Sequence, residues 1–487
     1  MASVIRVAIA QEKSGDTQDL VDRLRGIMGR NAVISHPGEA SLYSRDASNM
    51  TGVVGAVCFP TSTAQVAAVV GLANQLGRPF LARGSGTGLA GGAVPTGEPI
   101  VLVLTRMDKI LEIDLDNMIA WIEPGVINLD LTRQLAKVGM HFAPDPSSQQ
   151  SCTIGGNVAN NSGGPHCLAY GVTSPHIAAL EVVLPDSSIV MLGSIGDGHG
   201  LDLRGVFIGS EGTCGVATKI AVRLTPNPPA VRTLLLAFSD TSAATACVSA
   251  IISAGLVPAA LEMMDQRITN AVEDFVHAGY PRDAAAVLLV EIDGLPAGCD
   301  AGAELVREIG EAHGAMSVRL AADDNERMLL WKGRKTAFGA VARIKPNYYL
   351  HDTVVPRSAL TAVLQQVYEI ADRHDLIVMN VFHAGDGNLH PLLVFDAREP
   401  GIMERVHAAG EEIVRASLAA GGVLSGEHGI GLEKRDLMPL QFSPVDLAAQ
   451  DVIRSCFDPF GLANPLKVLP HGSRCGDSHQ APAGLWI

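Results

Sequence analysis

Aromatic residues are scarce in this 487-residue chain, because Phe, Trp and Tyr together make up only 4% of it. Cations are outnumbered as well: 36 Lys and Arg stand against 51 Asp and Glu, for a formal net charge of −15 at pH 7. Proteins bind nucleic acids through cations that contact phosphates and through aromatic rings that stack on bases. The composition therefore disfavours a nucleic-acid partner and favours small-molecule ligands.

Two sequence features are missing altogether. The eight cysteines include no C-x-x-C pair, which argues against zinc knuckles and iron–sulfur clusters and favours reduced structural thiols. No uncharged apolar run approaches the roughly 18–20 residues that span a bilayer. The N-terminal apolar run, interrupted by Arg6, is too short for a signal peptide. The sequence predicts a cytoplasmic protein, with the inner membrane reached, if at all, through a partner.

The length predicts two or three domains, at the usual ~100–200 residues per domain, and the alternation of strands and helices after residue 231 suggests an α+β sandwich as the second. A Pro-rich break at 225–231 suggests a domain boundary. Residues 144–171 are rich in Gly, Ser, Asn, Pro and Thr, a segment too long to be a passive connector. Helical spacing and caps predict helices at 18–29, 62–77, 128–139, near 241–254 and 301–314, 358–374, 401–419 and 443–462. Strands are expected at 79–83, 100–107, 110–114, 118–125, 177–192, 219–226, 232–240, 259–265, 284–294 and 316–321.

Two histidines, His383 and His390, flank a polar turn in the apolar run NVFHAGDGNLHPLLVF, residues 380–395. Asp-Gly between apolar segments is a strong signal for a two-residue hairpin turn, because such turns need residues that tolerate positive φ. With Asp386-Gly387 as the turn, His383 lies directly opposite His390, with Cβ atoms about 4.5–5.5 Å apart. The pair suits a shared metal ion, but it also suits two hydrogen-bonded histidines on a half-buried sheet. A third metal ligand elsewhere in the sequence is needed to distinguish the metal site from the hydrogen-bonded pair.

Three glycine-rich loops offer small residues together with hydroxyl and amide groups: RGSGTGLAGGA (83–93), CTIGGNVANNSGG (152–164) and GSEGTCG (209–215). The first contains G-x-G-x-x-G, but the chain continues into a strand rather than a helix, which excludes a Rossmann site, and no P-loop lysine follows. Backbone N–H groups unobstructed by Cβ atoms can still form an anion-binding nest. One such loop could also be a flexible surface segment, the less favoured interpretation, and two more such loops weaken it and favour a dinucleotide cofactor.

These loops, together with PDPSS at 144–148, resemble in order and spacing the FAD-binding domain of the vanillyl-alcohol-oxidase/PCMH-type flavoproteins. HAGDGNLH, SGEHGIG and NPLKVLP are similar to the FAD-linked oxidase C-terminal domain of a group of D-lactate dehydrogenases, glycolate oxidase subunits and D-2-hydroxyglutarate dehydrogenases. The resemblance spans residues 40–470 and implies an α+β fold. The implied chain begins with a two-subdomain PCMH-type FAD-binding domain (1–228), followed by an α+β cap domain with an antiparallel sheet and the metal-binding hairpin (229–427). A C-terminal helical segment (428–470) then returns to the FAD domain, and a flexible tail (471–487) ends the chain.

The resemblance also implies where FAD binds. The first loop cradles the pyrophosphate, segments between 144 and 164 line the flavin and its ribityl chain, and the third loop lies near the adenosine end. Some relatives attach FAD covalently through a histidine in the first loop, a position that Thr87 occupies here, so non-covalent FAD is expected. The implied cofactor-binding residues are Arg83, Gly84, Ser85, Gly86, Thr87, Gly88, Gly91, Pro144, Asp145, Ser147, Thr153, Gly155, Gly156, Asn157, Ser162, Gly163, Gly164, Glu211, Gly212, Gly215, Val216 and Asn464.

The same resemblance supplies a third metal ligand. In the family, the two hairpin histidines and a glutamate matching Glu427 hold a divalent metal, and the next residue, His428, is the proposed base. Two imidazoles and a carboxylate suit Zn, Mn or Fe, so the ion is left open. A metal-bound hydroxyl loses its proton more readily, histidine with a pKa near 6.5 can accept it, and the C2 hydrogen leaves as hydride to flavin N5. Arg334 matches the arginine that binds the substrate carboxylate, although composition alone makes it a surface charge beside Lys332 and Lys335.

The resemblance predicts an FAD- and metal-dependent dehydrogenase of a 2-hydroxy acid. A D-2-hydroxyglutarate-type enzyme would need a cation near Leu350 and a polar residue near Phe338, and because both are apolar here, D-lactate or glycolate is favoured. The alternatives are that D-2-hydroxyglutarate type, a metal-dependent hydrolase of a nucleotide-like substrate, and a non-catalytic subunit. Electrons would pass to a quinone, a cytochrome, an electron-transfer flavoprotein or an iron–sulfur subunit. The oligomeric state, a homodimer included, is left open.

Overall fold

The computed structural model describes residues 14–34, 36–196, 198 and 200–470. The expected tail 471–487 and the N-terminal stretch up to residue 13 lie outside these described residues. The chain forms two compact units. The glycine-loop unit contains the described residues of Ser3–Gly163, Val172–Asn227 and Glu427–Ile487, and the cap unit contains Gly164–Gly171 and Pro228–Gly426.

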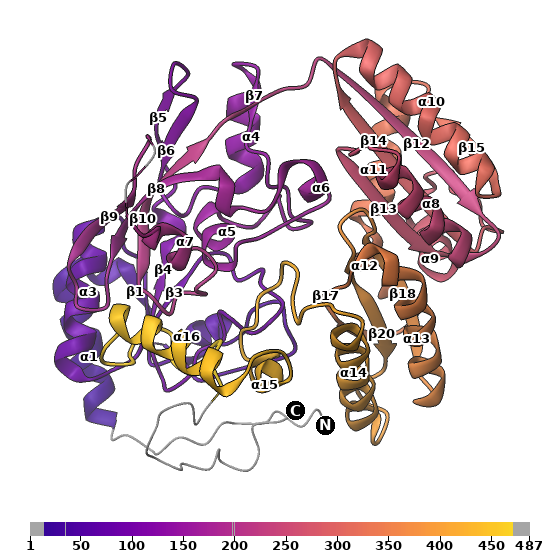
Figure 1. Cartoon of the computed structure of the whole chain (residues 1–487). Helices are drawn as coiled ribbons and strands as arrows, with labels where there is room; N and C mark the ends of the chain where they lie inside the picture. Colours follow the sequence, from indigo (N-terminus) through magenta and orange to yellow (C-terminus); the bar gives the residue numbers. More distant parts are fainter. Residues whose placement is uncertain (1–13, 35, 197, 199, 471–487) are drawn as a thin grey trace. The chain divides into compact units, whose positions relative to one another are not determined.

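The glycine-loop unit is built on two main sheets (Figure 1). One has the order β1-β2-β4-β3 and is parallel apart from β1, and the other is antiparallel with the order β5-β6-β10-β8-β9. The strands are β1 Val33–Ile34, β2 Ala56–Cys58, β3 Phe80–Arg83, β4 Ile100–Val103, β5 Ile110–Asp114, β6 Ile119–Ile122, β8 Ile177–Val183, β9 Ile189–Gly193, β10 Val216–Arg223, and a small pair, β7 Met140–His141 with β11 Thr225–Pro226.

Helices cover these sheets and connect their strands. They are α1 Ser14–Met28, α2 Pro37–Ala40, α3 Thr63–Leu76, α4 Asn128–Ala136, α5 Ile154–Asn160, α7 Leu203–Phe207, α15 Met438–Gln441 and α16 Pro444–Phe457. The predicted caps of α3 are confirmed: the Ser62 side chain accepts from the Gln65 N–H, and Gly77 ends the helix with φ +58°. Buried side chains of α1 and α3 share one core with strands of both sheets.

Helix α5 lies within residues 144–171, where the sequence predicted no helix. Thr153 caps it, because its hydroxyl accepts from the Gly156 N–H at 3.1 Å. Ile154 and Val158, one turn apart, are fully buried. Packing of this apolar face therefore outweighs the cost of two glycines in the helix, each about 1 kcal/mol relative to alanine.

The C-terminal segment contacts the rest of the glycine-loop unit. Phe80 and Ala463 form a parallel bridge, and the Asn464 N–H donates to the Phe80 carbonyl at 2.8 Å. The Lys467 ammonium, fully buried, donates to the Val94 carbonyl at 2.7 Å. Burial lowers the pKa of Lys467 to about 7. This segment therefore pairs with β3 and stabilises the loop that follows it.

The cap unit is an antiparallel sheet with the main path β15-β12-β14-β13-β18-β19-β17, to which β20 and β16 are added beside β18. Its strands are β12 Ala230–Phe238, β13 Ala260–Asp265, β14 Ala286–Gly294, β15 Ala315–Leu320, β16 Asn347–Leu350, β17 Thr353–Val354, β18 Ile377–His383, β19 Asn388–Leu389 and β20 Pro391–Phe395. The sheet and the domain type agree with the predicted α+β class.

One face of this sheet forms the apolar core of the cap unit. Leu261 and Met263 belong to that core, together with side chains of the helices α8, α10, α13 and α14. Because side chains alternate across a strand, Glu262 projects from the opposite face. The helices are α6 Cys167–Tyr170, α8 Thr241–Ser253, α9 Gln266–Val276, α10 Pro296–Ala312, α11 Asp324–Lys335, α12 Ala337–Val341, α13 Leu360–Arg373 and α14 Ile402–Ala419. Of these, α6, α9, α11 and α12 were not expected from the sequence.

The short segment Gly164–Gly171 belongs to the cap unit although the chain on either side of it does not. His166 Nε2 lies 3.2 Å from the Glu291 carboxylate, and its ring lies over Trp331 with centroids 5.4 Å apart. The Tyr170 hydroxyl donates to Asp293. Leu168 packs against Gly385 so closely that a Cβ there would lie 2.3 Å from it. The segment is thus fastened to β14 and to the histidine hairpin.

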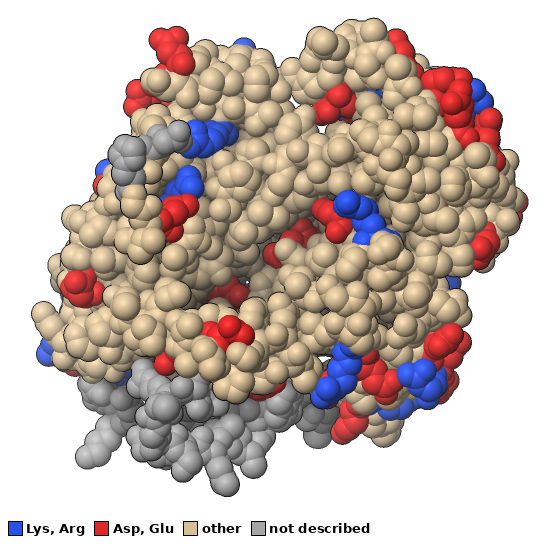
Figure 2. Space-filling view, in the orientation of Figure 1, with Lys and Arg blue, Asp and Glu red and all other residues tan. Residues whose placement is uncertain are grey.

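On the drawn face, most of the surface is uncharged, and the basic and acidic side chains lie in small mixed groups (Figure 2). None of the helices in the described part of the chain has the length and continuous apolar character that a bilayer span requires. The described cysteines are all thiols, with no disulfide among them. Cys475 lies outside the described residues.

Candidate functional site

The histidine hairpin forms, but its register differs from the predicted one. His383 pairs with Asn388, and Asn380 pairs with Pro391, so four residues rather than two make the turn. A two-residue type I′ turn needs positive φ at both central positions, and of Asp386 and Gly387 only Gly387, at +77°, has it. The turn is also held from outside, since the Val355 N–H donates to the Gly387 carbonyl at 3.0 Å.

The register shift leaves the two histidines on one face of the sheet as diagonal neighbours instead of direct partners. Their rings meet edge to face with centroids 5.1 Å apart, within reach of one another as diagonal pairs are. Both side chains are almost completely buried, with 3% exposure for His383 and 1% for His390. The structure therefore brings the two predicted ligands together, by a different pairing from the predicted one.

Glu262, which sequence reasoning missed, holds His383. The two residues are direct partners across β13 and β18, and His383 Nδ1 lies 2.8 Å and 3.0 Å from the two carboxylate oxygens. An ionised carboxylate only accepts, so Nδ1 carries a proton, and in the neutral ring Nε2 is then the nitrogen with the lone pair. Burial would raise the pKa of Glu262, but the charge of Arg334 and the contact with His383 outweigh it and lower that pKa. A glutamate inside the apolar strand AALEMMD was the signal available in the sequence.

Arg334 lies on α11 and is buried, with 1% exposure. The surface-charge interpretation that composition favoured is therefore wrong. Its Nη2 lies 2.5 Å from Glu262 Oε2. Nε and Nη1 have no hydrogen-bond partner among the described residues. Buried guanidinium donors without partners are costly, and the planar fork suits a carboxylate, so this side chain fits an anionic ligand.

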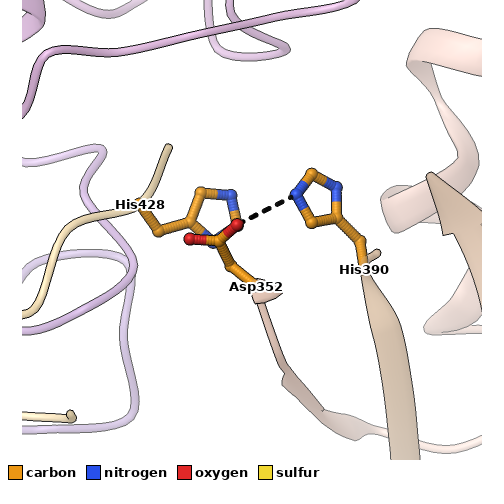
Figure 3. A group of neighbouring side chains, drawn as sticks. All are labelled: Asp352, His390 and His428. Carbon is orange, nitrogen blue, oxygen red and sulfur yellow. Dashed lines mark ion pairs between the residues drawn. The ribbon is translucent and has the colours of Figure 1, made fainter. Parts of the chain in front are cut away.

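Asp352, between β16 and β17, is a second carboxylate that sequence reasoning missed. Its Oδ1 forms an ion pair with His390 Nε2 at 3.6 Å (Figure 3). The same carboxylate accepts from the Ser425 hydroxyl at 2.5 Å and from the Gly426 N–H at 3.0 Å. Gly426 also rests on the Asn388 side chain, which a Cβ there would meet at 2.5 Å. These contacts hold Ser425 and Gly426, the last residues of the cap unit, against the histidine hairpin.

Glu427 and His428 follow Gly426 directly and open the last segment of the glycine-loop unit. The His428 carbonyl accepts from the Asn160 side chain at 3.0 Å. The turn that follows is held by Glu211, whose carboxylate accepts from the Ile430 N–H at 2.7 Å and from the Gly431 N–H at 2.9 Å. The predicted glycine-flanked turn is therefore present, with Gly429 at φ +86°.

The first glycine loop, as placed, presents its backbone rather than its arginine. The Arg83 guanidinium folds back beneath Gly86, where a Cβ would lie 2.1 Å from it, and donates to the Ala93 carbonyl at 3.2 Å. Between Ser85 and Leu89 no backbone N–H donates to another described residue. A run of such donors fits the pyrophosphate of a dinucleotide. Phosphate binding by the Arg83 side chain itself stays a prediction.

The second and third loops lie in the same unit, and several of their predicted ligands have structural partners. The Asn157 carbonyl oxygen accepts from Asn128 at 2.9 Å, and Asn464 donates to the Glu211 carbonyl at 2.6 Å. The buried Ser210 hydroxyl has no partner among the described residues. Gly84 packs on Thr153, whose hydroxyl a Cβ would meet at 2.3 Å, so the first two loops adjoin. Glycines and hydroxyls placed in this way fit a cofactor that lies against the backbone.

Comparison with known proteins agrees with this geometry. A family model described as FAD linked oxidases, C-terminal domain, matches residues 227–468, and one described as FAD binding domain matches residues 54–193. The fold resembles that of p-cresol methylhydroxylase with substrate bound, with a TM-score of 0.81 and 17% identity, over 96% of this chain and 99% of that one. By class, the chain is an FAD-linked oxidoreductase with the PCMH-type fold.

Glycolate oxidase subunit GlcD from Escherichia coli (strain K12) is 45% identical over 422 residues, 86% of this chain and 85% of that protein. GlcD from Bacillus subtilis (strain 168) is 37% identical over 94% of this chain and 98% of its own length. D-lactate dehydrogenase from Anaerostipes hadrus is 33% identical over 84% of this chain and 88% of its own length. The chain belongs to the FAD-linked oxidase family. Membership in this family removes the support for the alternative prediction of a metal-dependent hydrolase.

Proposed function

We propose that this protein is an FAD- and divalent-metal-dependent dehydrogenase that oxidises a small 2-hydroxy acid, D-lactate or glycolate, to the 2-oxo acid. The observation that carries the proposal is Arg334: a buried guanidinium whose Nε and Nη1 lack partners among the described residues. It shares Glu262 with His383, so an anion anchor and a metal-type histidine pair lie together in the cap unit. The names of the relatives, a glycolate oxidase subunit and a D-lactate dehydrogenase, support the same substrate class.

His383, His390 and Glu427 would hold the metal. The first two are buried neighbours, and the third is one peptide bond beyond Gly426, which rests on the hairpin residue Asn388. Two nitrogens and one oxygen with open positions suit Zn, Mn or Fe. The donor set therefore fits a divalent cation without naming it. FAD would bind non-covalently along the glycine loops.

When bound, the metal would supply Lewis acidity that lowers the pKa of the substrate hydroxyl, and FAD would supply the acceptor for the C2 hydride. Side chains of the protein bind and orient the substrate and accept its proton. Arg334 binds the substrate carboxylate in a bidentate manner and thereby orients the C2 hydrogen. His428 accepts the hydroxyl proton. The buried surroundings of His383 and Arg334 exclude water from the anchoring groups.

Two apolar side chains limit the substrate to a small one. The Phe338 ring, on α12, lies 6.5 Å from the His390 ring between centroids. Leu350, at the end of β16, is 8% exposed. Neither offers a partner for a second carboxylate, which disfavours a D-2-hydroxyglutarate-type substrate. Glycolate and lactate carry only a hydrogen or a methyl group at that end.

The reduced flavin must pass its electrons on. We propose a quinone, a cytochrome, an electron-transfer flavoprotein or an iron–sulfur subunit as acceptor, since the sequence has no cluster motif of its own. The two GlcD relatives are named as subunits, which supports an assembly with a partner chain. The cytoplasm remains the proposed location, with any contact to the inner membrane made through that partner.

The test is anaerobic reduction of the purified, FAD-loaded protein. D-lactate or glycolate should bleach the yellow flavin, prior removal of divalent metal should abolish bleaching, and added Mn²⁺ or Zn²⁺ should restore it. Glu427→Gln should retain the flavin and lose turnover. The control is Glu399→Gln, a surface carboxylate of the cap unit paired with Lys345, which should behave as wild type. Full turnover in Glu427→Gln would reject the metal site, and a flavin that no small 2-hydroxy acid reduces would reject the function.

A further inference from the structure

The Glu262 carboxylate contacts two of the side chains assigned above. Its Oε1 lies 2.8 Å from His383 Nδ1, and its Oε2 lies 2.5 Å from Arg334 Nη2. The Glu262 side chain is 1% exposed, as is that of Arg334. Glu262 therefore has two buried partners, one on β18 and one on α11.

On the histidine side, the contact selects a tautomer. A carboxylate that accepts at Nδ1 keeps the proton there, and the lone pair then stands on Nε2, the nitrogen on the far side of the ring. Direct pairing of Glu262 with His383 across β13 and β18 fixes the ring orientation as well. A histidine held in this way meets a cation without rearranging.

On the arginine side, the contact balances a charge. A guanidinium stays protonated in proteins, so Arg334 brings a permanent positive charge into the interior. A divalent cation on the histidine pair would be repelled by it, because buried like charges interact strongly at low dielectric. The Glu262 carboxylate contacts both the guanidinium and the histidine ring, so its negative charge offsets that of Arg334 next to the histidine pair.

We propose that Glu262 is a positioning residue with two effects: it holds His383 in the metal-binding tautomer and offsets the charge of Arg334, so that a divalent cation and a carboxylate anchor can be buried together. The inference rests on the proposed function, because it takes His383 as a metal ligand and Arg334 as the substrate anchor. It adds a residue that touches neither the metal nor the substrate.

The two effects predict opposite responses to the loss of either side of the ion pair. In Glu262→Gln, the His383 tautomer is no longer fixed and Arg334 is uncompensated, so Mn²⁺ should bind 10–100-fold more weakly, the range for lost outer partners of metal ligands. In Arg334→Met, Glu262 still holds His383 and the repelling charge is gone, so Mn²⁺ should bind as tightly as in wild type or more tightly. A purely structural ion pair would give the same loss in both.

The measurement is calorimetric titration of Mn²⁺ into metal-free, FAD-loaded protein. The double variant Glu262→Gln/Arg334→Met should bind Mn²⁺ more tightly than Glu262→Gln alone, because it lacks the uncompensated cation. Asp265→Asn is the matched control: Asp265 is a buried carboxylate on the same strand, but it accepts from Asn380 and Ile268 rather than from the site. It should retain the wild-type affinity.

Wild-type Mn²⁺ affinity in Glu262→Gln, or a loss in Arg334→Met equal to that in Glu262→Gln, would overturn the positioning role. If Glu262→Gln does not fold, as judged by near-ultraviolet circular dichroism, Glu262→Asp and Arg334→Met decide. The shorter carboxylate should weaken Mn²⁺ binding, and Arg334→Met should not. Wild-type protein that binds no divalent metal, or that no 2-hydroxy acid reduces, would instead refute the proposed function.

Discussion

Gly387 in the histidine turn offers the sharpest test of how the hairpin is built. Its φ is +77°, and a Cβ added there would lie 2.2 Å from the Val355 carbonyl oxygen. Ordinary contact begins at 3.4 Å, so in Gly387→Ala that carbonyl must retreat by about 1.2 Å. The move also disturbs the 3.0 Å hydrogen bond from the Val355 N–H to the Gly387 carbonyl.

The cost can be estimated from these two changes. Left-handed backbone costs an alanine roughly 1–2 kcal/mol, and a lost hydrogen bond about 1 kcal/mol more. We therefore expect Gly387→Ala to lower the free energy of unfolding by about 2–3 kcal/mol. A displacement of about 1 Å near the hairpin should also reduce kcat/KM by about 10²-fold.

The chain supplies a matched control. Gly401 has a similar φ of +72°, but a Cβ there would meet no atom within 4 Å. Gly401→Ala should therefore show the backbone cost alone, with unchanged kcat/KM and unchanged Mn²⁺ affinity. Urea unfolding and steady-state kinetics of both variants are the assays. Equal destabilisation in the two variants, with full activity in Gly387→Ala, would refute the account of the turn.

Other parts of the molecule give three further predictions. Phe338→Ala should open the site beside His390 and raise kcat/KM for longer 2-hydroxy acids relative to glycolate. An unchanged preference across a panel of 2-hydroxy acids would show that Phe338 does not limit the substrate's length. Acid precipitation should release FAD into the supernatant, since Thr87 cannot form the histidyl link, and yellow colour retained in the pellet would contradict non-covalent binding. Burial lowers the pKa of Lys467 to about 7, so between pH 7 and about 10 the unfolded chain binds more protons and stability rises with pH, by up to about 1.4 kcal/mol per unit. Lys467→Met should flatten that rise in urea unfolding at pH 7 and pH 9, and an unaltered slope would show that Lys467 does not cause it.

Local signals in the sequence predicted the elements well. The caps at Ser62 and Gly77 act within one turn of α3, and β12 to β14 are short, nearly continuous apolar runs of the kind that strands buried on both faces share. Helix α5 was missed because its glycines lower helix propensity, while the burial of Ile154 and Val158 that stabilises it depends on distant strands.

The site was predicted less completely, for a physical reason. The register of the hairpin depends on Val355 and on β13, which hold the turn from outside, so the Asp-Gly signal alone placed the pairing incorrectly. Arg334 looked like a surface charge because its partner, Glu262, is 72 positions away in the sequence. Long-range pairs of this kind leave no local periodicity. The local sequence signal for Glu262 was an acidic residue inside an apolar strand.

The Gly164–Gly171 segment limits how the cap unit can be transferred between proteins, in engineering and in evolution. The cap is not one uninterrupted stretch of polypeptide, so a gene fragment for residues 228–426 would encode a cap lacking His166 and Tyr170, the partners of Glu291 and Asp293. A transplant of the cap between related enzymes must carry these eight residues along with it. Recombination at a single pair of breakpoints would mismatch them, and the two stretches should therefore have been exchanged or retained together.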